Sequence, residues 1–306
     1  MPFVQRMFTA LPQDCQSPTA GGSGMSFLPG PRRPHFDVDP EVASPFAVAA
    51  TEEERATLSL LRDALDQGRM RLAFQPAVYA ADPSIIGFYE GYIRFLDPVG
   101  RVIPARDFVG ISETREIGRE IDVAALRLGL SCLRRNPDIR VAVNISARSV
   151  GYPPWTQLLA DALRAYPELG RGLILEINEA SAMQMPDVLI PFIEEWRGAG
   201  LAFTLDDFGA SVTSLTLLRD FGFDIAKIDG QFIRGCDYDP AAQPIVRAAG
   251  ALAREFNMFL VAEAVETMAE ADWLAAQGVG CLQGYLFGRP EVTPDFSLFR
   301  RGREAV

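Results

Sequence analysis

The chain has 306 residues, of which 48% are hydrophobic and 23% charged, so it can bury a sizeable core and is not disordered throughout. Its net charge of −11 disfavours binding to duplex DNA, although a bound cation could still bring in a small phosphate ester. The single histidine, His35, lies in a Pro/Gly-rich stretch, which excludes hydrolases with a histidine base and histidine-rich zinc sites.

The N-terminal stretch, residues 1–50, is rich in proline, contains a GGSG run and lacks any helical or strand periodicity. We predict a flexible, disordered leader there. Thr51 and Glu54 have the spacing of a capping box, which predicts a helix that begins at Thr51 and runs to Gly68. Residues 51–306 are predicted to form one domain.

The cellular location is predicted from what the sequence lacks. It contains no run of 18 apolar residues that would predict a membrane span, and its N-terminus lacks the pattern of a signal peptide. Its four cysteines form no CxxC pair, as expected for reduced thiols. We therefore expect a cytoplasmic protein.

From residue 71 onward, short apolar runs alternate with helix-length segments. Eight runs are predicted strands: 72–78, 85–95, 139–145, 172–178, 201–207, 224–229, 258–265 and 279–284. Helices are predicted between most of them, for example at 121–135, 186–200 and 243–256. This alternation predicts the α/β class and a (β/α)₈ TIM-like barrel. A doubly wound open sheet is the alternative, but no GxGxxG motif follows the first strand.

The first two predicted strands, 72–78 and 85–95, are joined by only about six residues, which is hairpin length and too short for a helical crossover. We therefore expect them to be antiparallel, in a barrel that is irregular at its start.

Polar side chains lie within the second predicted strand, at Glu90, and near the C-terminal ends of the strands that follow. They are Glu90, Asn144, Glu176, Asp206, Asp207, Lys227, Asp229, Glu263, Glu266 and Gln283. In a barrel these ends converge on one mouth. Carboxylates with an amide oxygen, and without histidine or cysteine, suit Mg²⁺, Mn²⁺ or Ca²⁺ better than zinc. The repulsion among so many acids indicates one or two bound divalent cations.

Each of these residues also has a plain structural explanation. Asp206 and Asp207 could form a turn with an Asp N-cap, Asn144 could cap a helix, and Lys227 could pair with a neighbouring acid. Lys227 could instead be the Schiff-base lysine of an aldolase, but such a lysine needs an apolar pocket rather than a ring of carboxylates. Polar groups at so many strand ends favour a functional site over these explanations.

The segments that carry these polar residues resemble motifs of the EAL domain family of cyclic di-GMP phosphodiesterases, and the resemblance extends over roughly residues 55–300. Glu90-Gly91-Tyr92 stands at the family's name motif, with Arg94 as its following arginine. The other matching motifs occur in the family's order: FQP (74–76), VNIS (143–146), LEINE (175–179), LDDFGASVTSL (205–215), KIDGQFI (227–233), AEAVET (262–267) and QGYLFGRP (283–290).

The resemblance implies a barrel with an antiparallel first strand. It also implies hydrolysis of cyclic di-GMP to linear pGpG with two Mg²⁺ or Mn²⁺ ions, in a domain that commonly forms a homodimer. The metal ligands that it implies are Glu90, Asn144, Glu176, Asp206, Asp207 and Glu263. The catalytic residues are Glu263, Lys227 and Asp207; the substrate-binding residues are Gln75, Arg94 and Gln283; the residues that anchor the loop after Asp207 are Glu266 and Glu179.

Two departures from the family pattern leave a second function open. Gly91-Tyr92 replaces Ala-Leu beside Glu90, which could reshape the pocket wall. Ser211 and Val212 replace a glycine and an aromatic residue in the loop after Asp207. If that glycine position requires a positive φ, Ser211 should strain the loop. The alternative to an active enzyme is therefore a catalytically impaired domain that binds cyclic di-GMP as a receptor.

Overall fold

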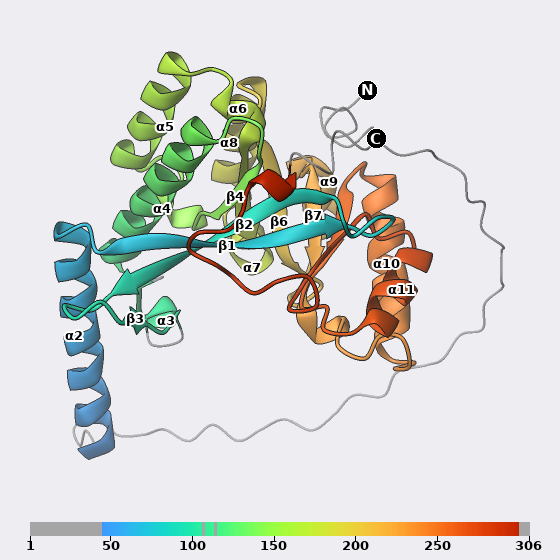
Figure 1. The fold of residues 1–306 in the computed structure, drawn as a ribbon, viewed down its shortest axis with the longest axis horizontal. Coiled ribbons are helices and arrows are strands. Elements are labelled where there is room, and N and C mark those ends of the chain that lie inside the picture. Colours follow the sequence, from blue (N-terminus) through green and yellow to red (C-terminus); the bar gives the residue numbers. More distant parts are fainter. Residues whose placement is uncertain (1–44, 106–107, 113–114, 300–306) are drawn as a thin grey trace.

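The structure, a computed structural model, describes residues 45–105, 108–112 and 115–299. Within this part, the chain forms a closed barrel of eight strands with helices packed around its outside (Figure 1). The strand order is β1-β9-β8-β7-β6-β5-β4-β2, and pairing of β1 with β2 closes the ring. The predicted (β/α)₈ barrel is confirmed, and the closure excludes the doubly wound open sheet.

All eight predicted strands are present. They are β1 (Met70–Tyr79), β2 (Ile86–Leu96), β4 (Val141–Asn144), β5 (Leu173–Asn178), β6 (Ala202–Phe208), β7 (Ile225–Ile228), β8 (Phe259–Ala262) and β9 (Cys281–Gln283). β1 runs antiparallel to both β2 and β9, while the remaining barrel neighbours are parallel. The predicted antiparallel start is therefore confirmed. The sequence analysis missed β3 (Val102–Ile103), a two-residue strand paired with β2 outside the ring.

Helices connect the parallel strands and cover the outside of the barrel (Figure 1). The described helices after α2 are α3 (Val109–Ser112), which lies beside β3, α4 (Glu116–Arg135), α5 (Pro153–Ala165), α6 (Leu169–Gly172), α7 (Glu179–Gln184), α8 (Pro186–Gly198), α9 (Leu215–Phe221), α10 (Ala242–Glu255) and α11 (Met268–Ala276), with short 3₁₀ turns η2 (Ala147–Ser149) and η3 (Gly230–Phe232). Their apolar faces bury residues such as Leu126, Leu159 and Ile193 against the outer face of the strands. This shell is the main core of the domain.

The interior of the barrel contains a separate apolar layer with one residue from every strand. Its members are Ala77, Phe88, Ala142, Ile174, Ala202, Ile225, Val261 and Cys281. Small and large side chains share the layer, so it fills the inside of the barrel without a pore. This layer forms the floor on which the polar residues described below lie.

The N-terminal helix α2 (Pro45–Asp66) begins six residues earlier than predicted, so the expected N-cap at Thr51 is wrong. Proline is well suited to a first helical turn, and the following FAVAA segment is alanine-rich, so the helix extends through it. The predicted boundary between residues 50 and 51 thus falls within α2, and residues 1–44 lie outside the described residues. Leu61 packs with Phe95 and Phe108 in a small satellite core beside β3.

None of the helices in the described part of the chain is both long enough and apolar enough to cross a membrane.

Candidate active site

A layer of polar residues lies directly above the apolar floor of the barrel. Because strand side chains alternate with a period of two, the residue two positions after each floor residue points into the same interior. On the antiparallel strand β1, it is the residue two positions before. The rule selects Gln75, Glu90, Asn144, Glu176, Thr204, Lys227, Glu263 and Gln283. Six of the residues that the sequence analysis singled out near strand ends thus lie in this layer. Asp229 instead caps the 3₁₀ turn η3, where its side chain accepts a hydrogen bond from Gln231 N.

Lys227 lies at the centre of this layer and is completely buried. It is the only lysine in the chain, in which every other basic side chain except His35 is an arginine. Its Nζ lies 2.8 Å from Glu90 Oε2, 3.3 Å from Glu176 Oε1 and 3.2 Å from Asp206 Oδ1. It also forms an ion pair with Glu263 Oε1. One ammonium group thus faces four carboxylates.

The four carboxylates outnumber the single ammonium group, and this imbalance shifts the pKa values of the cluster. Burial disfavours the ammonium form, but the surrounding carboxylates outweigh it and raise the pKa of Lys227. A raised pKa favours the ammonium form of Lys227, whereas a Schiff-base nucleophile must be the neutral amine. Burial raises the pKa values of Glu176 and Glu263, and repulsion by the neighbouring carboxylates raises them further. One cation therefore does not neutralise the cluster.

Among the four carboxylates that face Lys227, Glu90 accepts the most side-chain hydrogen bonds. Its Oε2 accepts hydrogen bonds from Lys227 Nζ at 2.8 Å and from Gln283 Nε2 at 2.8 Å. Its Oε1 accepts one from Asn144 Nδ2 at 3.1 Å. Burial opposes ionisation, but Lys227 and Gln283 hold the pKa of Glu90 at about 2.

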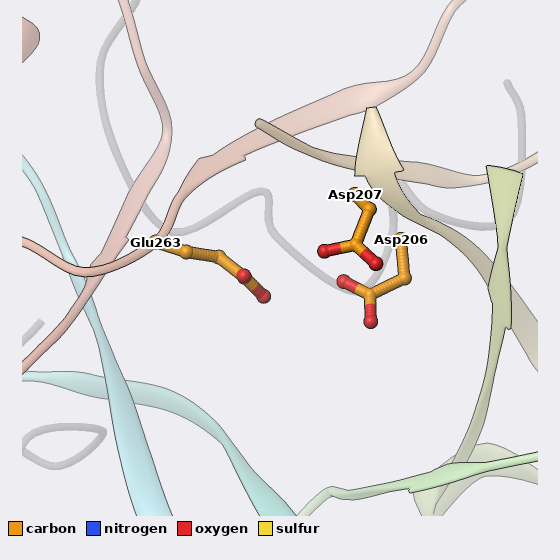
Figure 2. Close-up of side chains that lie close together, drawn as sticks. All are labelled: Asp206, Asp207 and Glu263. Atoms are coloured by element: carbon orange, nitrogen blue, oxygen red, sulfur yellow. The ribbon is translucent and has the colours of Figure 1, made fainter. Parts of the chain in front are cut away.

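Asp206, Asp207 and Glu263 form the more open side of the site. Each offers one carboxylate oxygen, and these three oxygens all lie within 4.8 Å of one another. Figure 2 shows Glu263 extending from the chain after β8 toward the two aspartates, which lie where β6 ends. Asp207 adopts a φ of 55°, a left-handed conformation that aspartate tolerates better than most residues. Burial, together with repulsion by Asp206 and Asp229, raises the pKa of Asp207 to about 6.

The donor set fits divalent cations. Glu176 is fully buried, and within the described part of the chain its Oε2 has neither a hydrogen bond nor an ion pair. The buried Oε1 of Gln283 likewise has no hydrogen-bond partner among the described residues. Unpartnered buried oxygens beside carboxylates with raised pKa values are costly unless a cation satisfies them. Hard oxygen ligands of this kind match Mg²⁺ and Mn²⁺.

The loop after Asp207 is anchored by Glu179, the first residue of α7. The Glu179 side chain is buried, and its Oε2 accepts hydrogen bonds from Gly209 N at 3.3 Å and from Ser211 N at 3.0 Å. Ser211 Oγ donates to the same oxygen at 2.7 Å, and Thr213 Oγ1 donates to Oε1. This one carboxylate thus ties the loop to the end of β5.

The expected strain at Ser211 is wrong. Among the described non-glycine residues, positive φ values occur at Asp207, Asn257 and Ala264, and not at Ser211. The turn takes its left-handed residues from Asp207 and Gly209, whose φ is 92°. The serine therefore fits the backbone and adds a hydrogen bond that a glycine could not make. Val212, at the other departure, has 93% of its surface exposed.

Replacing Ser211 with alanine should lower the free energy of unfolding by about 1 kcal/mol, because it removes a donor to a buried carboxylate. Urea unfolding would measure the change, and faster amide exchange in residues 209–213 would locate it. Ser59→Ala, the same change at an exposed position of α2, is the matched control and should change stability by less than about 0.5 kcal/mol. Equal stability of the Ser211→Ala variant and the parent would contradict this role.

Glu266 and Gln75, two further residues predicted to belong to the site, lie at its edge. Glu266 lies beside Arg234, with Oε1 3.7 Å from Nε, while the hydrogen bonds to the loop come from Glu179. A role for Glu266 in tethering the loop stays a prediction. Gln75 Nε2 donates to Gly288 O at 2.9 Å. Its side chain lines a pocket together with Glu263, Gln283 and other residues of the mouth.

Two residues of the site were missed by the sequence analysis. Thr204 completes the polar layer on β6, and its buried Oγ1 has no hydrogen-bond partner among the described residues. Tyr92 was considered only as pocket wall, yet its hydroxyl donates to Glu90 Oε2 at 2.9 Å. The burial of Tyr92 and the nearby carboxylates raise its pKa, so the hydroxyl keeps its proton. Strand alternation from Asp206 and from Glu90 is the signal that identifies both residues.

Comparison with known proteins assigns this arrangement to a family. The model of the EAL domain matches residues 59–290, which is most of the chain. The chain belongs to the EAL domain family.

Relatives of this EAL domain include named cyclic di-GMP phosphodiesterases. The bifunctional diguanylate cyclase/cyclic di-GMP phosphodiesterase MucR of Pseudomonas aeruginosa is 32% identical over 247 residues, which cover 79% of this chain and 36% of MucR. This chain spans about a third of the length of the curated relatives that it matches first, with shares of 36%, 30% and 31%.

Solved structures of EAL domains share the fold. The MucR phosphodiesterase in complex with cyclic di-GMP matches with a TM-score of 0.68 and 31% identity, over 79% of this chain and 99% of that one. Klebsiella pneumoniae BlrP1, in a complex with manganese and cyclic di-GMP, matches with a TM-score of 0.62 and 27% identity, over 72% of this chain and 56% of that one.

Proposed function

We propose that this EAL domain hydrolyses one phosphodiester bond of cyclic di-GMP to give linear pGpG, with the help of two Mg²⁺ or Mn²⁺ ions. The observation that supports this most strongly is the convergence of five carboxylates at the barrel mouth, four of which pair with the buried Lys227. Relatives named as cyclic di-GMP phosphodiesterases, and a neighbour that binds manganese with cyclic di-GMP, support the choice of substrate and cation.

The residues proposed to hold the cations are Glu90, Asn144, Glu176, Asp206, Asp207 and Glu263. Bound divalent cations would lower the pKa of water at the site and offset the charge of the phosphate, which supplies a nucleophile without histidine. Asn144 contacts Glu90 through its Nδ2, so its Oδ1 is not used in that contact. The unpartnered Glu176 Oε2 and the open cluster of Asp206, Asp207 and Glu263 supply the remaining oxygens.

The catalytic roles fall to Lys227, Glu263 and Asp207. Lys227 stays protonated, so its ammonium group can hold the attacking water and stabilise developing negative charge. Glu263, with 21% of its side chain exposed, is paired with Lys227 and can orient that water from the pocket side. Asp207, on β6, places a carboxylate oxygen within 4.8 Å of that of Glu263, so it can contact the same water or cation.

The substrate is proposed to lie in the pocket formed by Gln75, Tyr92, Glu263 and Gln283. Arg94 can donate two parallel hydrogen bonds to a phosphate oxygen pair, which lysine cannot do. Without cations, the carboxylates at the mouth would repel the dianionic nucleotide, so productive binding depends on the cations.

We also propose that the domain works in the cytoplasm and forms a homodimer. Cys132, Cys236 and Cys281 are buried, free thiols, which supports a reducing compartment. Val212 and Leu215 are exposed apolar residues at the loop, with 93% and 54% of their surface accessible, which supports contact with a second copy there.

Incubating the purified protein with cyclic di-GMP and Mn²⁺ should yield pGpG, and excess EDTA should reduce the rate to background. Adding Mn²⁺ in excess over the chelator should restore the rate, because only the cations are removed and not the carboxylates. Separation of the nucleotides by ion-exchange chromatography measures the product. Tight binding without hydrolysis at any cation concentration would support the receptor alternative, and an undiminished rate in EDTA would overturn the metal-dependent mechanism.

A further inference from the structure

One face of strand β2 carries three functional side chains in a row. Glu90, Tyr92 and Arg94 occupy every second position of the strand, so they project from the same face at increasing height above the apolar floor. Glu90 is a proposed cation ligand, and Arg94 a proposed phosphate-binding residue. Tyr92 lies between them and departs from the family's pattern, which has leucine at this position.

The Tyr92 hydroxyl completes a set of donors around one oxygen of Glu90. It donates to Oε2 at 2.9 Å, the oxygen that also accepts from Lys227 and Gln283. Gln283 Nε2 lies 3.4 Å from the same hydroxyl oxygen. Three donors on Oε2 fix the rotation of the carboxylate, so Oε1 keeps a single direction beside Asn144.

The Tyr92 ring makes a second contact, on its face. The Arg94 guanidinium carbon lies 5.4 Å from the centre of the ring, within the range of a cation–π interaction. Tyr92 is half-buried and lines the same pocket as Glu263 and Gln283. A leucine at this position could make neither the hydrogen bond nor the cation–π contact.

We propose that Tyr92 is a positioning residue that links the cation site to the phosphate-binding arginine, with its hydroxyl orienting Glu90 and its ring orienting Arg94. The inference rests on the proposed function for the identity of the cation and the nucleotide. It goes beyond that function because it assigns two separable tasks to a residue in which this chain departs from the family pattern.

Two substitutions separate the tasks. Tyr92→Phe removes the hydroxyl and keeps the ring, whereas Tyr92→Leu removes both. Titration calorimetry of the metal-free protein with Mn²⁺ should give a Kd raised about tenfold in both variants, as is usual when a partner that orients a metal ligand is lost. At saturating Mn²⁺, the KM for cyclic di-GMP should stay near the parent value in Tyr92→Phe. It should rise about fivefold in Tyr92→Leu, because only that variant loses the support of Arg94.

Tyr166 provides a matched control, because it is exposed and forms a comparable contact with Arg134, whose Cζ lies 5.8 Å from the ring centre. Tyr166→Leu should leave the Mn²⁺ Kd and the KM unchanged. Circular dichroism of each variant would verify that it is folded.

The outcomes distinguish this inference from the proposed function. If the parent binds neither Mn²⁺ nor cyclic di-GMP, the proposed function and the role of Tyr92 are both overturned. If the parent hydrolyses cyclic di-GMP but Tyr92→Phe keeps its Mn²⁺ affinity, only the link to Glu90 is overturned. An unchanged KM in Tyr92→Leu overturns the link to Arg94.

Discussion

A Glu263→Gln variant should hydrolyse cyclic di-GMP at least about 10²-fold more slowly than the parent, while nucleotide binding remains measurable. Glutamine keeps the size and the hydrogen-bonding reach of the side chain but removes the charge that faces Lys227 and the two aspartates. The water-positioning carboxylate is lost, while Gln75 and Arg94 still contact the nucleotide in this proposal. Single-turnover assays would measure the rate, and fluorescence anisotropy with a labelled nucleotide would measure binding.

The matched control is Glu255→Gln, the same chemical change at an exposed position of α10. It should leave both rate and affinity unchanged. Equal rates for Glu263→Gln and the parent, with the control also unchanged, would show that Glu263 does not position the attacking water.

The barrel could be predicted from the sequence because its strands are buried on both faces and separated by helix-length segments. The boundaries of the eight apolar runs are clear enough that each predicted strand overlaps an observed one. The short link between 72–78 and 85–95 correctly predicted that the first two strands are antiparallel. The start of α2 was not predictable in the same way. The capping pattern at Thr51 is a local signal, and the apolar, alanine-rich residues before it continue the helix through that signal.

Most members of the site could be predicted from the sequence, with Thr204 and the hydroxyl of Tyr92 as exceptions, but their contacts could not. Strand alternation places Glu90, Glu176, Lys227 and Glu263 on the inner face, because each lies two residues beyond an apolar floor residue. No sequence pattern shows that Lys227 contacts four carboxylates at once, since those contacts depend on the closure of the ring. The expected strain at Ser211 failed for a related reason, because the backbone takes its positive φ values at Asp207 and Gly209 instead.

Replacing Lys227 with methionine should destabilise the metal-free protein by about 3–5 kcal/mol and abolish hydrolysis, because it leaves buried carboxylates without their only lysine partner. Methionine has a similar length and keeps the packing, so the loss of stability reflects the missing charge and not a cavity. Urea unfolding in EDTA would measure the free energy of unfolding. Mn²⁺ should raise the Tm of the variant more than that of the parent, because cations would replace part of the missing positive charge.

A second substitution makes the test specific to charge. In the Lys227→Met background, Glu90→Gln removes the carboxylate whose low pKa depends most on Lys227, so the double variant should be more stable than Lys227→Met alone. A double variant less stable than Lys227→Met would mean that the loss of Lys227 acts through packing and not through charge.

The pH dependence of the Lys227→Met variant gives an independent check of the same electrostatic model. Without the ammonium group, burial and mutual repulsion should raise the pKa values of the remaining carboxyl groups further, in the direction already present at Glu176 and Glu263. A carboxyl group with a raised pKa binds more protons in the folded state than in the unfolded state, so the free energy of unfolding falls as the pH rises. The variant should therefore gain stability as the pH is lowered from neutral toward the ordinary pKa of glutamate, and more of it than the parent, because the parent retains one cation among its carboxylates. A variant whose stability does not change over this interval would contradict a cluster in which Lys227 carries the neutralising charge.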